Sequence, residues 1–175
     1  KNGTIWRWNR PLIGFDADGS PHLRIEHRVM AAVPTSLDMA ANMALFYGLT
    51  EWYSTRELPP EVKLPFEVAR RNFYAAAQFG LNATVHWLDA REWQLDQLIL
   101  RELLPQASKG LEQLGVQDEL SNQLLAVIEA RVASGQTGAA WQRAFAEKYE
   151  RNFALLTREY RTRQRNREPV HTWSL

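Results

Sequence analysis

Hydrophobic and polar residues alternate in two runs near the start of the chain, on either side of Asp16-Ala17-Asp18-Gly19. In the second run Arg24, Glu26 and Arg28 occupy every second position, and every second side chain of an extended strand points to the same face. The alternate row holds Leu23, Ile25, His27 and Val29, and its apolar members can pack on a core. Asp-Gly favours a tight turn between the runs. The pattern therefore predicts a β-hairpin with strands at about 5–15 and 21–30.

The length of the hairpin loop decides which residues of the first strand share a face with Arg24, Glu26 and Arg28. If Asp18-Gly19 is a two-residue turn, Arg28 faces Asn9, and Arg7 and Asn9 share the charged face. The same register sets Arg24 opposite Ile13 and Glu26 opposite Pro11. A loop of odd length reverses the parity and places Trp6, Trp8 and Arg10 on that face instead.

After Pro34 the apolar spacing predicts helices. Thr35 followed by Asp38 resembles a capping box, which marks the start of the first helix. Asp38 and Asn42 lie on one face of that helix, where either a ligand role or a cap with a satisfied buried amide explains them. We expect helices at 39–53, 66–79, 90–114 with a kink at Pro105, 117–133 and 139–166, with a short extended segment at 83–88.

These elements define an α+β fold in one domain of residues 1–175, with a hairpin in residues 1–33 and about five helices in residues 34–175. The sequence is 45% hydrophobic, enough for a core of domain size. Lys and Arg total 21 against 20 Asp and Glu, so charge predicts neither nucleic-acid nor membrane-surface binding. The absence of cysteine excludes thiolate sites, and with no apolar run of about 20 residues we expect a cytoplasmic location.

The clearest candidate chemistry lies in Arg24, Glu26 and Arg28. Glutamate supplies the hard oxygen ligand that Mg²⁺ accepts, and arginine forks bind carboxylate or phosphate oxygens in pairs. A solvated strand face with alternating charge is the alternative interpretation. The four histidines, at 22, 27, 86 and 171, form no pair with metal-ligand spacing.

An ordered set of motifs resembles the C-terminal part of bacterial glutamate–cysteine ligase-type carboxylate–amine ligases. The motifs are Arg24-Ile25-Glu26-His27-Arg28, Pro34-Thr35, Asp38, Ala41-Asn42, Arg71-Asn72, Phe79-Gly80-Leu81-Asn82 and Thr137-Gly138-Ala139-Ala140-Trp141-Gln142. The first is also similar to the strand that carries metal and phosphate ligands in glutamine synthetase. The resemblance covers nearly the whole chain, and it implies that the hairpin belongs to a larger antiparallel sheet of a longer ligase.

The resemblance also implies roles for individual residues. Such ligases couple ATP hydrolysis to amide formation between a glutamate-like acid and an amine. Glu26 would hold Mg²⁺, and Arg24 and Arg28 would contact ATP phosphates or the acid substrate. Arg7 or Asn9 would assist in the first register. One glutamate cannot hold the usual metal cluster, so we expect this chain to be inactive alone.

A second hypothesis needs no catalysis. A helical interaction module would pair with a partner through its exposed hairpin by strand addition. The same exposed sheet edge favours a homodimer.

Overall fold

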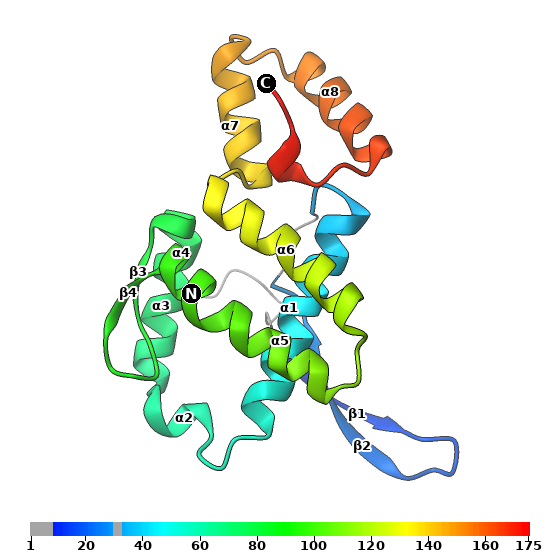
Figure 1. The fold of residues 1–175 in the computed structure, drawn as a ribbon, viewed down its shortest axis with the longest axis vertical. Helices are drawn as coiled ribbons and strands as arrows, with labels where there is room; N and C mark the ends of the chain where they lie inside the picture. The colour runs from blue at the N-terminus through cyan, green and yellow to red at the C-terminus, as the bar shows by residue number, and fades with distance from the viewer. Residues whose placement is uncertain (1–8, 30–32) are drawn as a thin grey trace. The chain divides into compact units, whose positions relative to one another are not determined.

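The computed structural model describes residues 9–29 and 33–175, and the chain forms two compact units, residues 1–33 and 34–175 (Figure 1). The first unit contains an antiparallel hairpin and the second is mainly helical. The predicted α+β class is therefore confirmed. Among the described residues, no helix combines the length and apolar character needed to cross a bilayer.

The hairpin joins β1 (Asn9–Phe15) to β2 (Pro21–His27) through a loop of odd length. The Asp16 amide donates to the Ser20 carbonyl at 2.9 Å, and the Gly19 amide donates to the Asp16 carbonyl at 2.9 Å. Gly19 has a φ of +85°, which glycine adopts without a steric penalty. This is the three-residue loop that ends in a left-handed glycine.

The odd loop fixes the strand register. Arg10 lies opposite Glu26, and Leu12 lies opposite Arg24. The register built on a two-residue turn was wrong, because Asp18 and Gly19 belong to a longer loop. The opposite row of the hairpin is not covered by a core in the part of the chain that the structure describes, since Leu23 is 81% exposed and Ile25 is 71% exposed.

The second unit is built from helices and one small hairpin. Its helices are α1 (Ser36–Ser54), α2 (Pro60–Lys63), α3 (Phe66–Phe79), α4 (Leu95–Leu98), α5 (Leu104–Gln113), α6 (Asp118–Ser134), α7 (Gly138–Lys148) and α8 (Phe153–Asn166). A π turn, Ile99–Leu103, joins α4 to α5, and 3₁₀ turns occur at Gly80–Asn82 and Val170–Thr172. The small hairpin pairs β3 (Thr84–His86) with β4 (Glu92–Gln94).

The main core lies where α1 packs on α5 and α6. Small residues allow α1 and α5 to approach closely: a Cβ added at Gly110 would collide with the Gly48 carbonyl oxygen. Ala41 and Ala107 are fully buried in the same cluster. This close crossing leaves no room for larger side chains at these positions.

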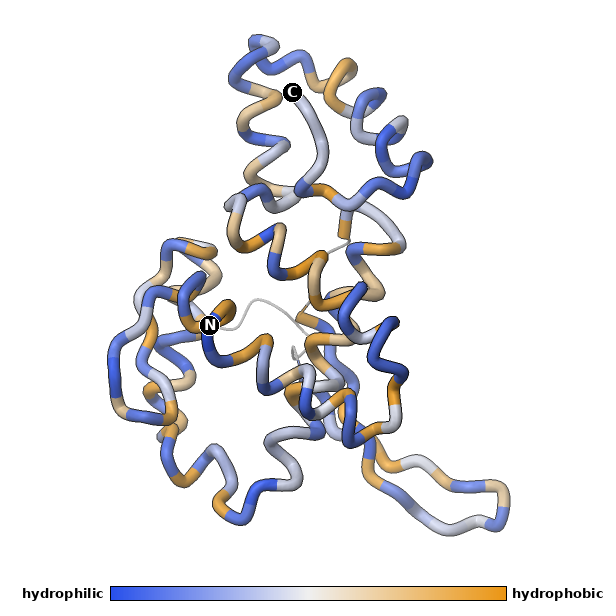
Figure 2. The backbone as a smooth tube through the Cα atoms, viewed as in Figure 1, coloured by the Kyte–Doolittle hydropathy of each residue, from blue (hydrophilic) through white to orange (hydrophobic). Residues whose placement is uncertain are grey.

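Two predicted helices differ from the structure. Residues 90–94 form a turn and β4 instead of the start of a helix, because β4 pairs with β3 and Ala90 takes a φ of +61°. The helix predicted at 139–166 divides into α7 and α8. Glu150 and Arg151 have positive φ, and the Asn152 side chain accepts from the Leu155 amide at 3.0 Å to cap α8. In Figure 2 the hydrophobic positions of α8 lie in its first turns, and its last turns are hydrophilic.

The C-terminal segment packs back on α7. Val170 and Trp173 are buried together with Trp141 and Phe145. The Gln136 side chain donates to the carbonyls of Val170 and Trp173, both at 2.8 Å. The tail is therefore an integral part of the helical unit.

Candidate functional site

One face of the hairpin carries the charged side chains of both strands. β2 contributes Arg24 and Glu26, and Arg28 follows the end of β2 on the same row. The observed register adds Arg10 from β1, directly opposite Glu26. Three arginines therefore share this face with one glutamate, and we call these four residues the charged row.

Two of the guanidinium groups hold Glu26. Arg28 binds both carboxylate oxygens, with Nε 2.7 Å from Oε1 and Nη2 2.9 Å from Oε2. Arg10 Nη2 lies 2.7 Å from Oε2. The hydrogen bonds from Arg28, followed by the charges of Arg10 and Arg28, lower the pKa of Glu26 despite some desolvation. Glu26 therefore stays ionised in the middle of the charged row.

Arg24 has a different environment. Its guanidinium lies across Gly14, since a Cβ added at Gly14 would come within 2.6 Å of Arg24 Nη2. Within residues 9–29 and 33–175, Arg24 makes no hydrogen bond or ion pair. The planar guanidinium of Arg24 has unused donors and lies over a glycine without a side chain, so it is suited to bind a carboxylate or phosphate.

Arg10 has an unused donor as well. Its Nε is buried and has no hydrogen-bond partner among the described residues, while Nη2 contacts Glu26. A buried donor without an acceptor is unfavourable. An acceptor supplied by a bound anion or by water would satisfy it.

The predicted position of Asn9 was wrong, because the odd loop places Asn9 on the face opposite the charged row. Asn9 Oδ1 lies 2.8 Å from Nδ1 of His27, its partner in the register. Burial lowers the pKa of His27. Arg7, the other residue expected from β1, lies outside the described residues. The register that sequence reasoning left open for an odd loop identifies Arg10, and the glycine in the third loop position was the signal for it.

The donor set of the charged row fits phosphate better than a metal ion alone. The described residues contain no group of three or more His, Asp or Glu that could hold a metal. Glu26 supplies one hard oxygen ligand. Mg²⁺ in proteins usually keeps several waters and binds one or two carboxylates together with substrate phosphates. The residues present therefore fit a magnesium ion that is shared with a phosphate ligand.

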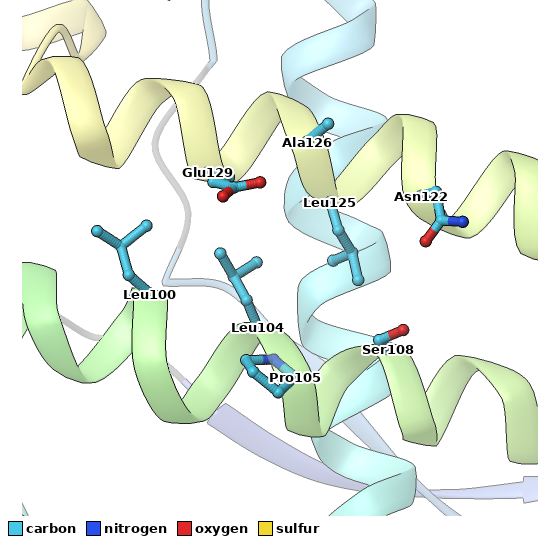
Figure 3. Close-up of a pocket in the computed structure, with 8 residues that line it drawn as sticks. All are labelled: Leu100, Leu104, Pro105, Ser108, Asn122, Leu125, Ala126 and Glu129. Atoms are coloured by element: carbon cyan, nitrogen blue, oxygen red, sulfur yellow. The ribbon is translucent and has the colours of Figure 1, made fainter.

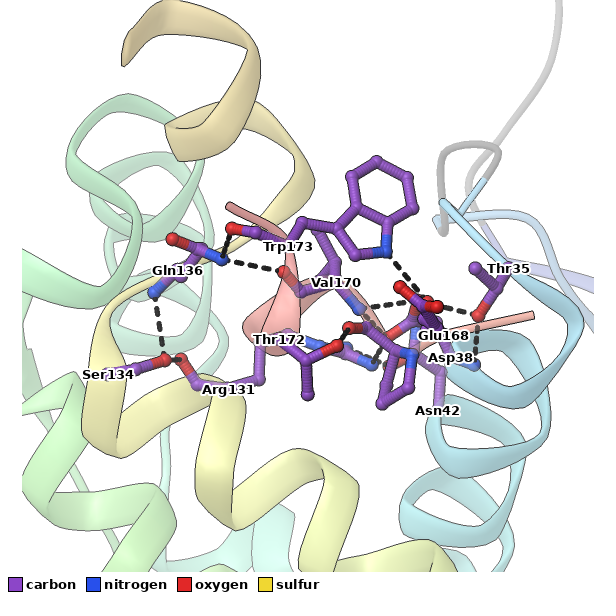
Figure 4. Close-up of polar contacts among 11 residues, drawn as sticks. Thr35, Asp38, Asn42, Arg131, Ser134, Gln136, Glu168, Val170, Thr172 and Trp173 are labelled. Atoms are coloured by element: carbon purple, nitrogen blue, oxygen red, sulfur yellow. Dashed lines mark hydrogen bonds and ion pairs between the residues drawn. The ribbon is translucent and has the colours of Figure 1, made fainter. Parts of the chain in front are cut away.

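The polar residues of α1 belong to a buried structural network (Figure 4). Arg131 donates from Nη2 to Asp38 Oδ1 and from Nη1 to Asn42 Oδ1, both at 2.7 Å. The Thr35 hydroxyl donates to Asp38 Oδ2 at 2.8 Å, and the Val170 amide donates to the same oxygen at 3.2 Å. Asp38 is fully buried, so these contacts favour the interpretation of a helix cap and a satisfied amide.

Other motifs of the chain also have structural roles. Asn72 fixes β3, since its side chain donates to the His86 carbonyl at 2.6 Å and accepts from the His86 amide at 3.0 Å. The Thr137 side chain caps α7 by accepting from the Ala140 amide at 3.1 Å. The glycine-containing loop before α7 therefore ends in an ordinary N-cap.

The helical unit contains a groove of about 440 Å³ between the α5 segment and α6 (Figure 3). Its lining is mostly apolar, and Glu129 is its single charged lining residue. No residue of the charged row lines this groove. The lining residues are Leu100, Leu104, Pro105, Ser108, Asn122, Leu125, Ala126 and Glu129.

Comparison with known proteins gives one match. The model of glutamate-cysteine ligase family 2 matches residues 7–169, which include the hairpin and nearly all of the helical unit. No curated protein and no solved structure matches the chain.

Proposed function

The chain belongs to glutamate-cysteine ligase family 2, and from this membership we propose that it serves an ATP-dependent ligase that joins a glutamate-like acid to an amine. The observation that carries the proposal is the charged row. Glu26 is held by Arg10 and Arg28, and Arg24 lies across Gly14 on the same face with unused donors. One carboxylate among guanidinium groups is the donor set that a nucleotide phosphate and its metal ion require.

The proposed reaction has two steps. The acid carboxylate attacks the γ-phosphorus of ATP, the bond to the bridging oxygen breaks, and an acyl phosphate and ADP form. The amine nitrogen then attacks the acyl carbon, phosphate leaves with the electrons of the C–O bond, and the nitrogen loses a proton. Negative charge on the transferred phosphoryl group is the main target for stabilisation.

The residues of the charged row would divide this work. Arg24 would bind phosphate oxygens through its unused fork, and Arg28 would hold Glu26 in position. Glu26 would be the protein ligand of Mg²⁺, which supplies charge neutralisation when it is bound. Arg10 would keep Glu26 ionised through its Nη2, 2.7 Å from Oε2.

Nucleotide binding tests the proposal directly. In a calorimetric titration with ADP and Mg²⁺, we expect Arg24→Gln to weaken binding about tenfold or more, because hydrogen bonds to charged groups contribute about 1.5–3 kcal/mol. The matched control is Arg70→Gln, an exposed arginine paired with Glu67 in the helical unit. An unchanged ADP affinity in Arg24→Gln, or no ADP binding by the parent chain, would contradict the proposal.

The apolar face of the hairpin favours a second candidate function, protein interaction. Ile13, Phe15, Leu23 and Ile25 are 69–81% exposed and lie on the face opposite the charged row. A partner strand or a second copy of the chain would cover them. Leu23→Lys should then abolish self-association in light scattering, whereas Glu26→Gln should leave it intact. A parent chain that stays monomeric at high concentration would argue against the second copy.

A further inference from the structure

We propose that the groove between the α5 segment and α6 is a binding site for a small aliphatic amine. The ammonium group of the ligand would pair with Glu129, and its carbon chain would lie on the leucines of the groove. All described lining residues belong to the helical unit, and none belongs to the charged row. The inference is therefore independent of the ligase proposal.

One end of the groove carries a carboxylate without a counter-ion. Glu129 lies on α6, and Leu100 and Leu104 lie across the groove from it (Figure 3). The Glu129 side chain makes no hydrogen bond or ion pair within the described part of the chain. No lysine or arginine is among the described residues that line the groove. The groove therefore favours a ligand that brings a positive charge.

The π turn adds a backbone acceptor to the same end. The Leu104 amide donates to the Ile99 carbonyl, which is one residue further back than in an α-helix. Pro105, the next residue, has no amide hydrogen. The Leu100 carbonyl therefore lacks both amides, four and five residues further on, that a helix could offer it. This carbonyl points along the helix toward Leu104 and Pro105, and both of these residues line the groove.

An ammonium group matches these two acceptors. It has three donors, so it can bind the Leu100 carbonyl and the Glu129 carboxylate at the same time. Hydrogen bonds with a charged donor and a charged acceptor are roughly twice as strong as neutral ones. A neutral ligand of the same shape could not form them.

The rest of the groove fits an uncharged carbon chain. Leu104 and Leu125 provide its apolar middle, and Ser108 and Asn122 lie at the end away from Glu129 (Figure 3). Asn122 and Glu129 lie two helical turns apart on α6, about 10 Å along its axis. The groove therefore offers one anionic position, followed by an apolar surface long enough for a chain of several carbons.

The size of the groove favours a small molecule over a protein partner. Its volume of about 440 Å³ falls within the range of about 300–1,000 Å³ that is usual for small-molecule sites. A stable protein interface uses about 20–30 residues on each side. Only eight described residues line this groove.

Titration of the 175-residue chain with hexylamine tests the inference. In NMR spectra of methyl-labelled leucine, we expect hexylamine to shift the signals of Leu104 and Leu125 to saturation. Leu23 of the hairpin is 81% exposed and reports nonspecific binding to apolar surface, so its signals should stay unchanged. 1-Hexanol has the same carbon chain without the charge, and it should bind at least about fivefold more weakly.

Two variants identify the contact with the ammonium group. Glu129→Gln should weaken hexylamine binding at least about fivefold and leave hexanol binding unchanged, which also shows that the groove is intact. Glu119→Gln removes a charge from the same helix outside the groove lining, and it should bind both ligands as the parent chain does.

Several results would overturn the inference. If hexylamine leaves Leu104 and Leu125 unshifted, or shifts Leu23 as readily, the groove is not a specific site. If hexanol binds as tightly as hexylamine, or if Glu129→Gln binds hexylamine like the parent chain, the groove does not recognise the ammonium group. None of these results bears on ADP binding, which tests the ligase proposal separately.

Discussion

Two guanidinium groups control the protonation of Glu26. The hydrogen bonds from Arg28 are the largest cause of its lowered pKa, and the charges of Arg10 and Arg28 add to it. We expect Arg28→Gln to raise the pKa of Glu26 toward the ordinary glutamate value. A pH titration of the Glu26 carboxyl carbon signal measures this shift, and Asp18, whose pKa is lowered by Ser20, is the internal control.

The lowered pKa also fixes the sign of the pH effect on stability. Because Glu26 binds its proton more weakly in the folded hairpin than in the unfolded chain, the interaction stabilises the hairpin above the ordinary glutamate pKa. This stabilisation is lost as the pH falls through the folded-state pKa. A Glu26 pKa that is the same in Arg28→Gln and in the parent chain would show that Arg28 does not hold the carboxylate.

Sequence reasoning identified part of the charged row, and the strand period explains which part. Arg24, Glu26 and Arg28 share a face because parity within one strand depends on local geometry alone. The partner from β1 depends on the loop, and a change of one loop residue exchanges Asn9 for Arg10. The paired hydrogen bonds from Arg28 to Glu26 depend on side-chain rotamers, which the residue pattern does not specify. That these residues bind a ligand stays a prediction.

The crossing of α1 and α5 depends on two glycines. Gly→Ala inside a helix normally stabilises by about 1 kcal/mol. We expect the opposite for Gly110→Ala, a loss of about 1–3 kcal/mol in the free energy of unfolding, because the new methyl group would collide with the Gly48 carbonyl oxygen. Urea denaturation measures the difference.

Ser108→Ala on the same helix is the matched control, since it improves helix propensity at a position that lines a groove. It should leave stability within about 0.5 kcal/mol or raise it. A stabilised Gly110→Ala variant would mean that α1 and α5 do not approach as closely as the structure shows.

An element is predicted correctly from the sequence where proline or glycine residues mark its ends. The bounds of α3 were predicted correctly, because Pro65 precedes the helix and Gly80 ends it with a φ of +59°. The kink expected at Pro105 corresponds to the π turn just before α5, since Pro105 has no amide hydrogen for the carbonyl four residues earlier. The β3–β4 hairpin was missed because cross-strand pairing, not local propensity, produces it.

At the scale of the helical unit, the Asp38–Arg131 pair joins three segments that are far apart in sequence. Asp38 lies on α1 and is fully buried, Arg131 lies on α6 with a side chain 13% exposed, and the Val170 amide of the C-terminal segment donates to Asp38. No pattern in the sequence indicates Arg131 as the partner. Contacts that span 93 residues depend on the tertiary fold.

Breaking this pair should weaken the whole helical unit. We expect Arg131→Gln to cost about 3–5 kcal/mol in the free energy of unfolding, because it leaves a buried carboxylate without its counter-ion. Asp38→Asn should cost a similar amount, and the double variant should cost clearly less than the sum of both. Urea denaturation of the four proteins gives the coupling energy.

The exposed Glu67–Arg70 pair of α3 provides the comparison. Arg70→Gln should change stability by less than about 1 kcal/mol, as is usual for solvent-exposed ion pairs. In limited proteolysis, we also expect Arg131→Gln to be cleaved sooner than Arg70→Gln within residues 167–175. Without Arg131, Asp38 loses its counter-ion, and the hydrogen bond from the Val170 amide to Asp38 no longer holds the tail as firmly. If the effects of Arg131→Gln and Asp38→Asn were additive, the two side chains would stabilise the unit independently. That result would contradict the direct ion pair, in which Arg131 Nη2 lies 2.7 Å from Asp38 Oδ1.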